Sequence, residues 1–100
     1  MHTTLNVQVT EEDIKNGNRG DATGCAAYLA VKRAMLNRGW SLGLNMDICV
    51  YGDVHLLIKD ECGSIVKGIL ISPHSDKMHD FAHSFDRRRV KPTEFLIFFE

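Results

Sequence analysis

Residues 21–40 form the stretch DATGCAAYLAVKRAMLNRGW, which we predict to be one long helix at the centre of the fold, because most of its residues favour helices. Asp21 or Thr23 can cap its start, and Gly39 can take the left-handed conformation that commonly follows a helix end. At about 100° per residue, its apolar side chains cover roughly half of the helix circumference. These side chains are Cys25, Tyr28, Leu29, Val31, Met35, Leu36 and Trp40. We therefore expect a core helix against which a sheet packs.

The length and composition are those of one folded domain. The 100 residues suffice for a single hydrophobic core, and a hydrophobic content of 44% with 25% charged residues is ordinary for a globular chain. A net charge of −1 means that no global field attracts nucleic acid or a membrane surface. Three cysteines without a Cys-x-x-Cys motif favour a reducing compartment, and neither a secretory leader nor a membrane span is evident. We expect a single domain over residues 1–100, in the cytoplasm.

The first segment of the chain predicts a strand followed by a short helix. Leu5, Val7 and Val9 alternate with polar residues, which is typical of a half-buried strand near a sheet edge. Thr10 can then cap one or two helical turns over residues 11–17, since three carboxylates follow it and a glycine ends the segment.

The second half of the chain predicts a meander, a helix and a final strand. Strands are expected at residues 46–51, 54–59, 65–71 and 94–99. Ser75 can cap a helix that runs to Asp86, with Met78, Phe81, Ala82 and Phe85 on its core-facing side. The final strand is apolar on both faces, so we place it in the middle of a sheet or under both helices. The order β-α-α-β-β-β-α-β predicts an α+β fold with a mostly antiparallel sheet of about five strands and helices on one face.

Two histidines on the helix at residues 75–86 are candidates for metal binding. His79 and His83 are spaced i, i+4, and Asp76 and Asp86 lie near the same stripe. A zincin motif needs a glutamate directly after the first histidine, but Asp80 stands there and no third ligand is evident. We therefore interpret the stripe as a solvated polar face and expect no metal, no cofactor and no catalytic residues. A metal-dependent enzyme that uses His79 and His83 stays as an alternative.

The glycine-rich segment at residues 17–24 is better explained as a connector than as a phosphate-binding loop. It lacks the Lys-Ser/Thr of a P-loop, and the Asp21 carboxylate would repel an anion. Cys25 lies near the start of the core helix, where a dipole can activate a thiol, but it falls on the apolar side of that helix. We interpret Cys25 as a small buried hydrophobic residue.

The densest charge in the chain follows the helix at residues 75–86. Arg87, Arg88, Arg89 and Lys91 are four cations in five residues. They can complement the C-terminal dipole of the helix, or bind phosphates or an acidic protein surface. No aromatic residues are interleaved with them, so we expect an acidic protein partner, with a nucleic-acid-binding regulator as the alternative.

Two segments are similar to a group of small uncharacterised proteins encoded by bacteriophages and mobile elements. Residues 7–17, V-Q-V-T-E-E-D-I-K-N-G, followed by Gly20, Asp21 and Cys25, resemble the start of that group. Residues 85–95, F-D-R-R-R-V-K-P-T-E-F, resemble its ending. The resemblance covers about half of the chain and implies no catalytic residues. It implies a gene product that acts in a bacterial cytoplasm by docking onto host proteins, including anti-CRISPR-type inhibition of defence complexes.

Together these observations favour a non-enzymatic binding protein that blocks or adapts a host protein complex. The expected partner-binding residues are Arg87, Arg88, Arg89, Lys91, Asp86, His83 and His79. The sequence leaves the oligomeric state open, and a second copy that covers apolar strand edges is one alternative.

Overall fold

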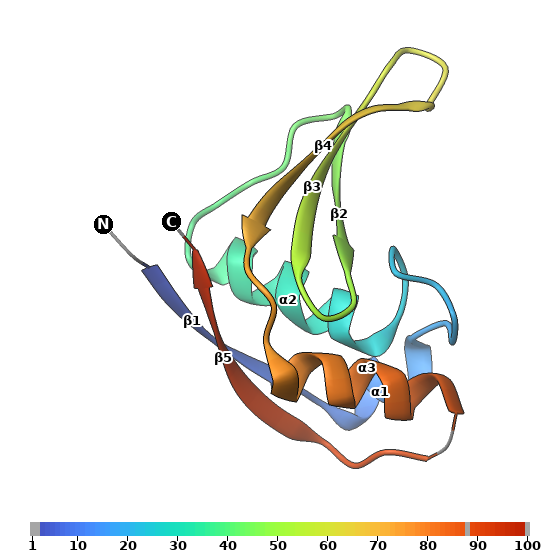
Figure 1. Cartoon of the computed structure of the whole chain (residues 1–100), viewed down its shortest axis with the longest axis vertical. Coiled ribbons are helices and arrows are strands. Elements are labelled where there is room, and N and C mark those ends of the chain that lie inside the picture. Colours follow the sequence, from blue (N-terminus) through green and yellow to red (C-terminus); the bar gives the residue numbers. More distant parts are fainter. Residues whose placement is uncertain (1–2, 88, 100) are drawn as a thin grey trace.

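The computed structural model describes residues 3–87 and 89–99. The fold is α+β, and its element order confirms the predicted one (Figure 1). The elements are β1 (Thr3–Val9), α1 (Glu11–Asn16), α2 (Ala26–Asn37), β2 (Met46–Val50), β3 (Val54–Lys59), β4 (Ile65–Ser72), α3 (Asp76–Arg87) and β5 (Thr93–Phe99). No helix among the described residues combines the length and the apolar character needed to cross a bilayer.

The strands form two sheets in place of the single sheet of about five strands that we expected. β2, β3 and β4 form the predicted antiparallel meander, with irregular pairing near both ends of the β3–β4 ladder. β1 pairs with β5 along its whole length, with Val7 opposite Phe95. In Figure 1 this two-stranded ribbon curves away from the lower end of β4. The two sheets share one core because α2 packs against both β1 and β2.

β5 differs from the prediction. It does not lie in the middle of a sheet, because among the described strands it pairs with β1 alone. Phe95, Ile97 and Phe99 are buried, whereas Leu96 and Phe98 are 54% and 53% exposed. Alternate side chains of a strand point to opposite faces, and here only one face of the ribbon is covered. Burial within the described chain therefore accounts for the apolar residues on only one face of β5.

The core helix α2 is shorter than predicted and begins at Ala26, not at residue 21. The residue that caps it is Cys25, whose Sγ accepts a hydrogen bond from the backbone N–H of Tyr28 at 3.4 Å. Asp21 instead closes a separate turn, in which its carboxylate accepts hydrogen bonds from the backbone and hydroxyl of Thr23. After the helix, Gly39 has φ +95°, which confirms the expected left-handed glycine.

The buried side of α2 is built mainly from small residues. Its buried residues are Ala26, Ala27, Tyr28, Ala30, Val31 and Met35. Leu36, which the sequence placed on the apolar side, is 51% exposed. Alanines let the helix backbone approach the sheets closely, so the contact face is centred on them and Leu36 turns away from it.

The other two helices begin and pack as predicted. Thr10 and Asp13 form a reciprocal capping box at the start of α1. At the start of α3 the Ser75 hydroxyl accepts a hydrogen bond from the N–H of Met78 at 3.3 Å. The four predicted core residues of α3 are buried. Its Phe81 ring lies 6.5 Å from the ring of Phe95, which anchors α3 on the inner face of β5.

Candidate functional site

The predicted cations lie at the C-terminal end of α3 and in the connection to β5. Arg87 is the last residue of α3, and the side chains of Arg87, Arg89 and Lys91 are exposed. Arg88 lies outside the described residues. The carbonyl groups at a helix C-terminus carry partial negative charge, which stabilises nearby cations. This part of the predicted site is therefore presented to solvent.

Two surface hollows share Arg89 and Val90, and further cations line each of them. A hollow of about 520 Å³ on one side also contains Lys77 and Lys91. A hollow of about 430 Å³ on the other side contains Lys15 and Arg19. We call the combined set the basic surface. It consists of Lys15, Arg19, Lys77, Arg89 and Lys91, whereas Arg87 lines neither hollow.

Three of these cations could not be assigned to the site from the sequence. Lys15 lies in the last turn of α1, Arg19 in the loop before α2 and Lys77 in the first turn of α3, so only tertiary packing brings them to Arg89. No local motif marks any of the three. The guanidinium of Arg19 lies 6.0 Å from the centre of the Phe85 ring, a cation–π distance that orients this flexible side chain.

Carboxylates do not neutralise the basic surface. Within residues 3–87 and 89–99, the ion pair of Arg33 with Asp13 is the only one formed by a lysine or arginine. Glu11 and Asp80 are the two carboxylates that line the hollows. The surface thus carries an excess of cations that form no ion pair with a described residue, although the net charge of the chain is only −1.

Asp86 performs a structural task. Its carboxylate accepts a hydrogen bond of 2.8 Å from the backbone N–H of Gly20, which has φ +72°. This bond connects the last turn of α3 to the loop before α2, and so holds that loop beside the basic surface. Asp86 is half-buried, and we infer that its contribution to binding is to position this loop.

His79 and His83 belong to an aromatic cluster on another side of α3. At about 100° per residue they point roughly 100–160° away from Lys77 and Ser84, which line a hollow of the basic surface. Their rings are stacked, with centroids 6.2 Å apart and an interplanar angle of 11°. The Tyr51 hydroxyl lies 3.2 Å from Nδ1 of His83. The expected site residues therefore occupy two separate surfaces.

The histidine cluster also includes a third imidazole that the sequence analysis did not consider. The ring of His74 lies 5.3 Å from that of His79, and its Nε2 is 3.0 Å from the Asp76 carboxylate. Gly52 allows this approach, because a Cβ there would lie 2.9 Å from atoms of both rings. Among the described residues, however, no group of three or more His, Cys, Asp and Glu side chains is arranged to hold a metal ion.

Cys25 has the features of a structural residue. Its side chain is buried, accepts the N–H of Tyr28, and lies 3.8 Å from the carbonyl oxygen of Val50, to which the thiol donates. Burial raises the pKa of the Cys25 thiol, which opposes formation of the reactive thiolate. These contacts favour a packing and capping role over a nucleophilic one.

Comparison of the chain with protein-family models, with curated proteins and with solved structures gives no match.

Proposed function

We propose that this protein is a small non-enzymatic binding protein of the kind encoded by phages and mobile elements, which docks onto a host protein complex in the bacterial cytoplasm and blocks or adapts it. An anti-CRISPR-type inhibitor of a defence complex is the specific form of this proposal. The observation that carries it is the basic surface around Arg89, where cations from α1, the following loop and α3 converge without an ion pair in the part of the chain that the structure describes.

The chemistry of this surface fits an acidic protein face. Exposed cations steer a negatively charged partner toward the surface and form charge-assisted hydrogen bonds with its carboxylates. The two hollows give the surface a shape into which such a partner can fit. Phe81 lines one hollow and Phe85 lines the other. Both rings are buried in the core and so do not form the exposed stacking platform that single-stranded nucleic acid favours. An acidic protein is therefore the better partner.

Charge reversal tests the proposal. The double variant Arg89→Glu, Lys91→Glu should lose the proteins that the wild type captures from a bacterial host, as identified by affinity purification and mass spectrometry. The control is Arg38→Glu, which makes the same charge change as each single substitution of the double variant, at an exposed position outside both hollows. The control should keep the same partners, and both variants should unfold at nearly the wild-type temperature.

Two results would contradict this assignment. If the Arg89→Glu, Lys91→Glu variant captured the same proteins as the wild type, the basic surface would not be the docking site. The wild type could instead shift the mobility of a DNA or RNA duplex at low salt, with a shift that added salt weakens steeply and that the same variant loses. That result would identify nucleic acid as the partner of the basic surface.

A further inference from the structure

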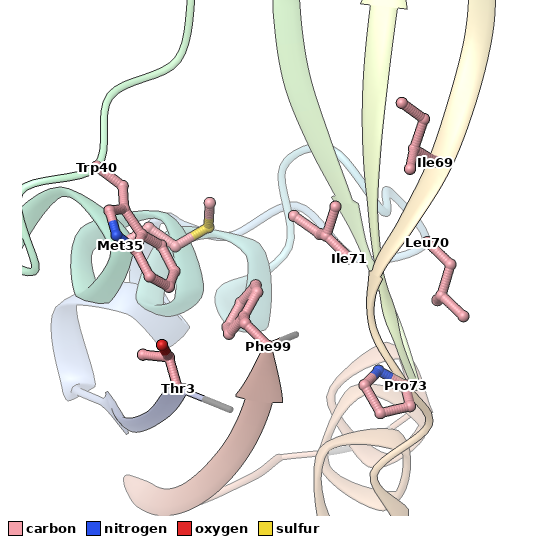
Figure 2. A pocket seen from close by; sticks show the side chains of 8 residues that line it. All are labelled: Thr3, Met35, Trp40, Ile69, Leu70, Ile71, Pro73 and Phe99. Atoms are coloured by element: carbon pink, nitrogen blue, oxygen red, sulfur yellow. The ribbon is translucent and has the colours of Figure 1, made fainter. Parts of the chain in front are cut away.

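An uncharged groove runs beside β4, away from the basic surface. It encloses about 560 Å³, and none of the residues that line it carries a charge (Figure 2). Ile69, Leu70 and Ile71 of β4 form one side. The other side is formed by Phe99 at the end of β5 and by Met35 and Trp40 at the end of α2. No residue of this groove also lines a hollow of the basic surface.

The groove follows the edge of β4, not one of its faces. Successive side chains of a strand point to opposite faces, so a cavity above one face is lined by every second residue. Here three consecutive residues, 69–71, line the same cavity. In Figure 2, Ile71 points toward Phe99 and Met35, whereas Leu70 points the other way. The opening therefore exposes the strand edge itself.

This edge has backbone groups without partners in the described chain. β4 is the last strand of its sheet, and its ladder runs to β3 alone. Within residues 3–87 and 89–99, no other backbone hydrogen bond involves residues 65–71. Residues 65–70 are all exposed, and Ile65, Val66 and Leu70 expose more than half of their side chains. An unpaired and mostly apolar edge is a template for another strand, and here Lys67 and Pro73 are the features of the kind that protect such edges.

The far wall of the groove is apolar and built from packed rings. Trp40 meets Phe99 edge to face, with ring centroids 5.1 Å apart at an angle of 74°. Met35 is buried beside them and supplies a flexible side chain that adapts to its neighbours. An incoming apolar side chain would thus leave water for a preformed pocket.

The extent of the groove indicates what it can hold. A stable interface between two folded proteins uses about 20–30 residues on each side. The groove itself is lined by eight residues, which matches one extended segment of a few residues. Strand addition needs only main-chain hydrogen bonds along the edge and small pockets for alternate side chains.

We propose that the groove binds an extended, uncharged, apolar segment of a partner protein, which adds to β4 as a fourth strand of the β2–β3–β4 sheet. Alternate side chains of the segment pack against Met35, Trp40 and Phe99. The proposal does not depend on the basic surface, because the two sites share no residues.

A library of random twelve-residue peptides displayed on phage, selected on the full-length protein, tests the proposal. The selected peptides should alternate apolar and uncharged polar residues. Their affinity, measured by fluorescence anisotropy, should fall about tenfold or more in Ile69→Lys and in Leu70→Lys, because a lysine protects a strand edge. Leu96→Lys is the matched control for Leu70→Lys, since both leucines are 54% exposed and Leu96 lies outside the groove. The control should bind within about twofold of the wild type.

Methylation of the peptide backbone tests the main-chain hydrogen bonds separately. N-methyl groups on alternate residues remove the N–H donors from one edge of the peptide. Methylation of one alternate set should abolish binding, and methylation of the other set should preserve it. The Arg89→Glu, Lys91→Glu variant should bind the selected peptides as the wild type does, which separates this site from the basic surface.

Several outcomes would overturn the proposal. Selection could enrich no peptide, or only acidic peptides that the Arg89, Lys91 variant fails to bind. The selected peptides could bind Ile69→Lys and Leu70→Lys as tightly as the wild type, or bind equally well after either methylation. Light scattering could also detect a wild-type dimer that Leu70→Lys dissociates, which would assign the β4 edge to a second copy of this chain.

Discussion

Arg33 of α2 holds both carboxylate oxygens of Asp13 in α1, with hydrogen bonds of 2.7 Å from Nη1 to Oδ1 and 2.6 Å from Nη2 to Oδ2. Nη2 also donates to the carbonyl oxygen of Gln8 at the end of β1. One guanidinium thus joins β1, α1 and α2, while the same carboxylate accepts the N–H of Thr10 in the capping box. Asp13 is only 4% exposed, so its charge depends on these partners.

Replacing Asp13 should therefore destabilise the fold. We expect Asp13→Asn to lower the free energy of unfolding by about 1–3 kcal/mol, because an amide cannot accept both hydrogen bonds from Arg33. Urea unfolding at pH 7 measures this change. Asp80→Asn, at a residue whose side chain is 82% exposed, serves as the control and should stay within about 0.5 kcal/mol of the wild type. Equal losses in the two variants would contradict the role of the ion pair.

The same carboxylate should make stability depend on pH. Burial by itself would raise the pKa of Asp13, but the hydrogen bonds from Arg33 and Thr10 outweigh it and lower the pKa below its ordinary value. A lowered pKa in the folded state adds stability that is complete above the unfolded value of about 4 and is lost as the pH falls through the folded value.

We expect the gap in unfolding free energy between the wild type and Asp13→Asn to be constant from pH 7 to about pH 5 and to shrink below about pH 4. Urea titrations at several pH values measure this gap. A gap that widens as the pH falls would give the opposite sign and contradict the lowered pKa of Asp13.

Gly17 lies where the chain leaves α1 and passes against the start of α2. A Cβ at this position would lie 2.5 Å from the backbone nitrogen of Ala26 and 2.9 Å from its Cα, and the backbone cannot move aside without shifting α2. Gly17→Ala should therefore cost about 1–3 kcal/mol of unfolding free energy. In Gly68→Ala the nearest atom lies at 3.8 Å, an ordinary contact, so that variant should be as stable as the wild type or slightly more stable. Thermal unfolding of both variants makes the comparison.

The three free cysteines should differ in reactivity. Cys62 is exposed, Cys49 is half-buried and Cys25 is buried, and burial raises the pKa of the Cys25 and Cys49 thiols. Iodoacetamide at pH 8, followed by peptide mass spectrometry, should label Cys62 first, Cys49 more slowly and Cys25 last. In urea the three rates should converge. Labelling of Cys25 in the folded protein as fast as Cys62 would show that its thiol is accessible and activated.

The sequence predicted the elements well where the signals were local. The alternation around Val7, the cap at Thr10, the apolar stripe of α3 and the glycine after α2 each depend on a few neighbouring residues, and the structure confirms all of them. The start of α2 was wrong, because Asp21 engages Thr23 in a turn of its own and leaves the cap to a cysteine, a residue seldom expected there.

The candidate sites show the same difference between features that depend on neighbouring residues and features that depend on tertiary packing. The exposed cations at and after the end of α3 were evident in the sequence because they lie within a few residues of one another, whereas Lys15, Arg19 and Lys77 approach Arg89 only through the packing of α1 and α3. The groove beside β4 was not foreseen at all. Its walls come from β4, β5 and α2, and no short stretch of sequence contains more than one of them.

The sequence by itself determined the order of the helices and strands and most of their apolar positions, because propensity, capping and periodicity act over a few residues. Only the tertiary structure decided how those positions are used. The pairing of β5 with β1 alone exposes Phe98, and the separation of the two sheets opens the edge of β4, because strand order depends on contacts between distant residues that compete for the same core.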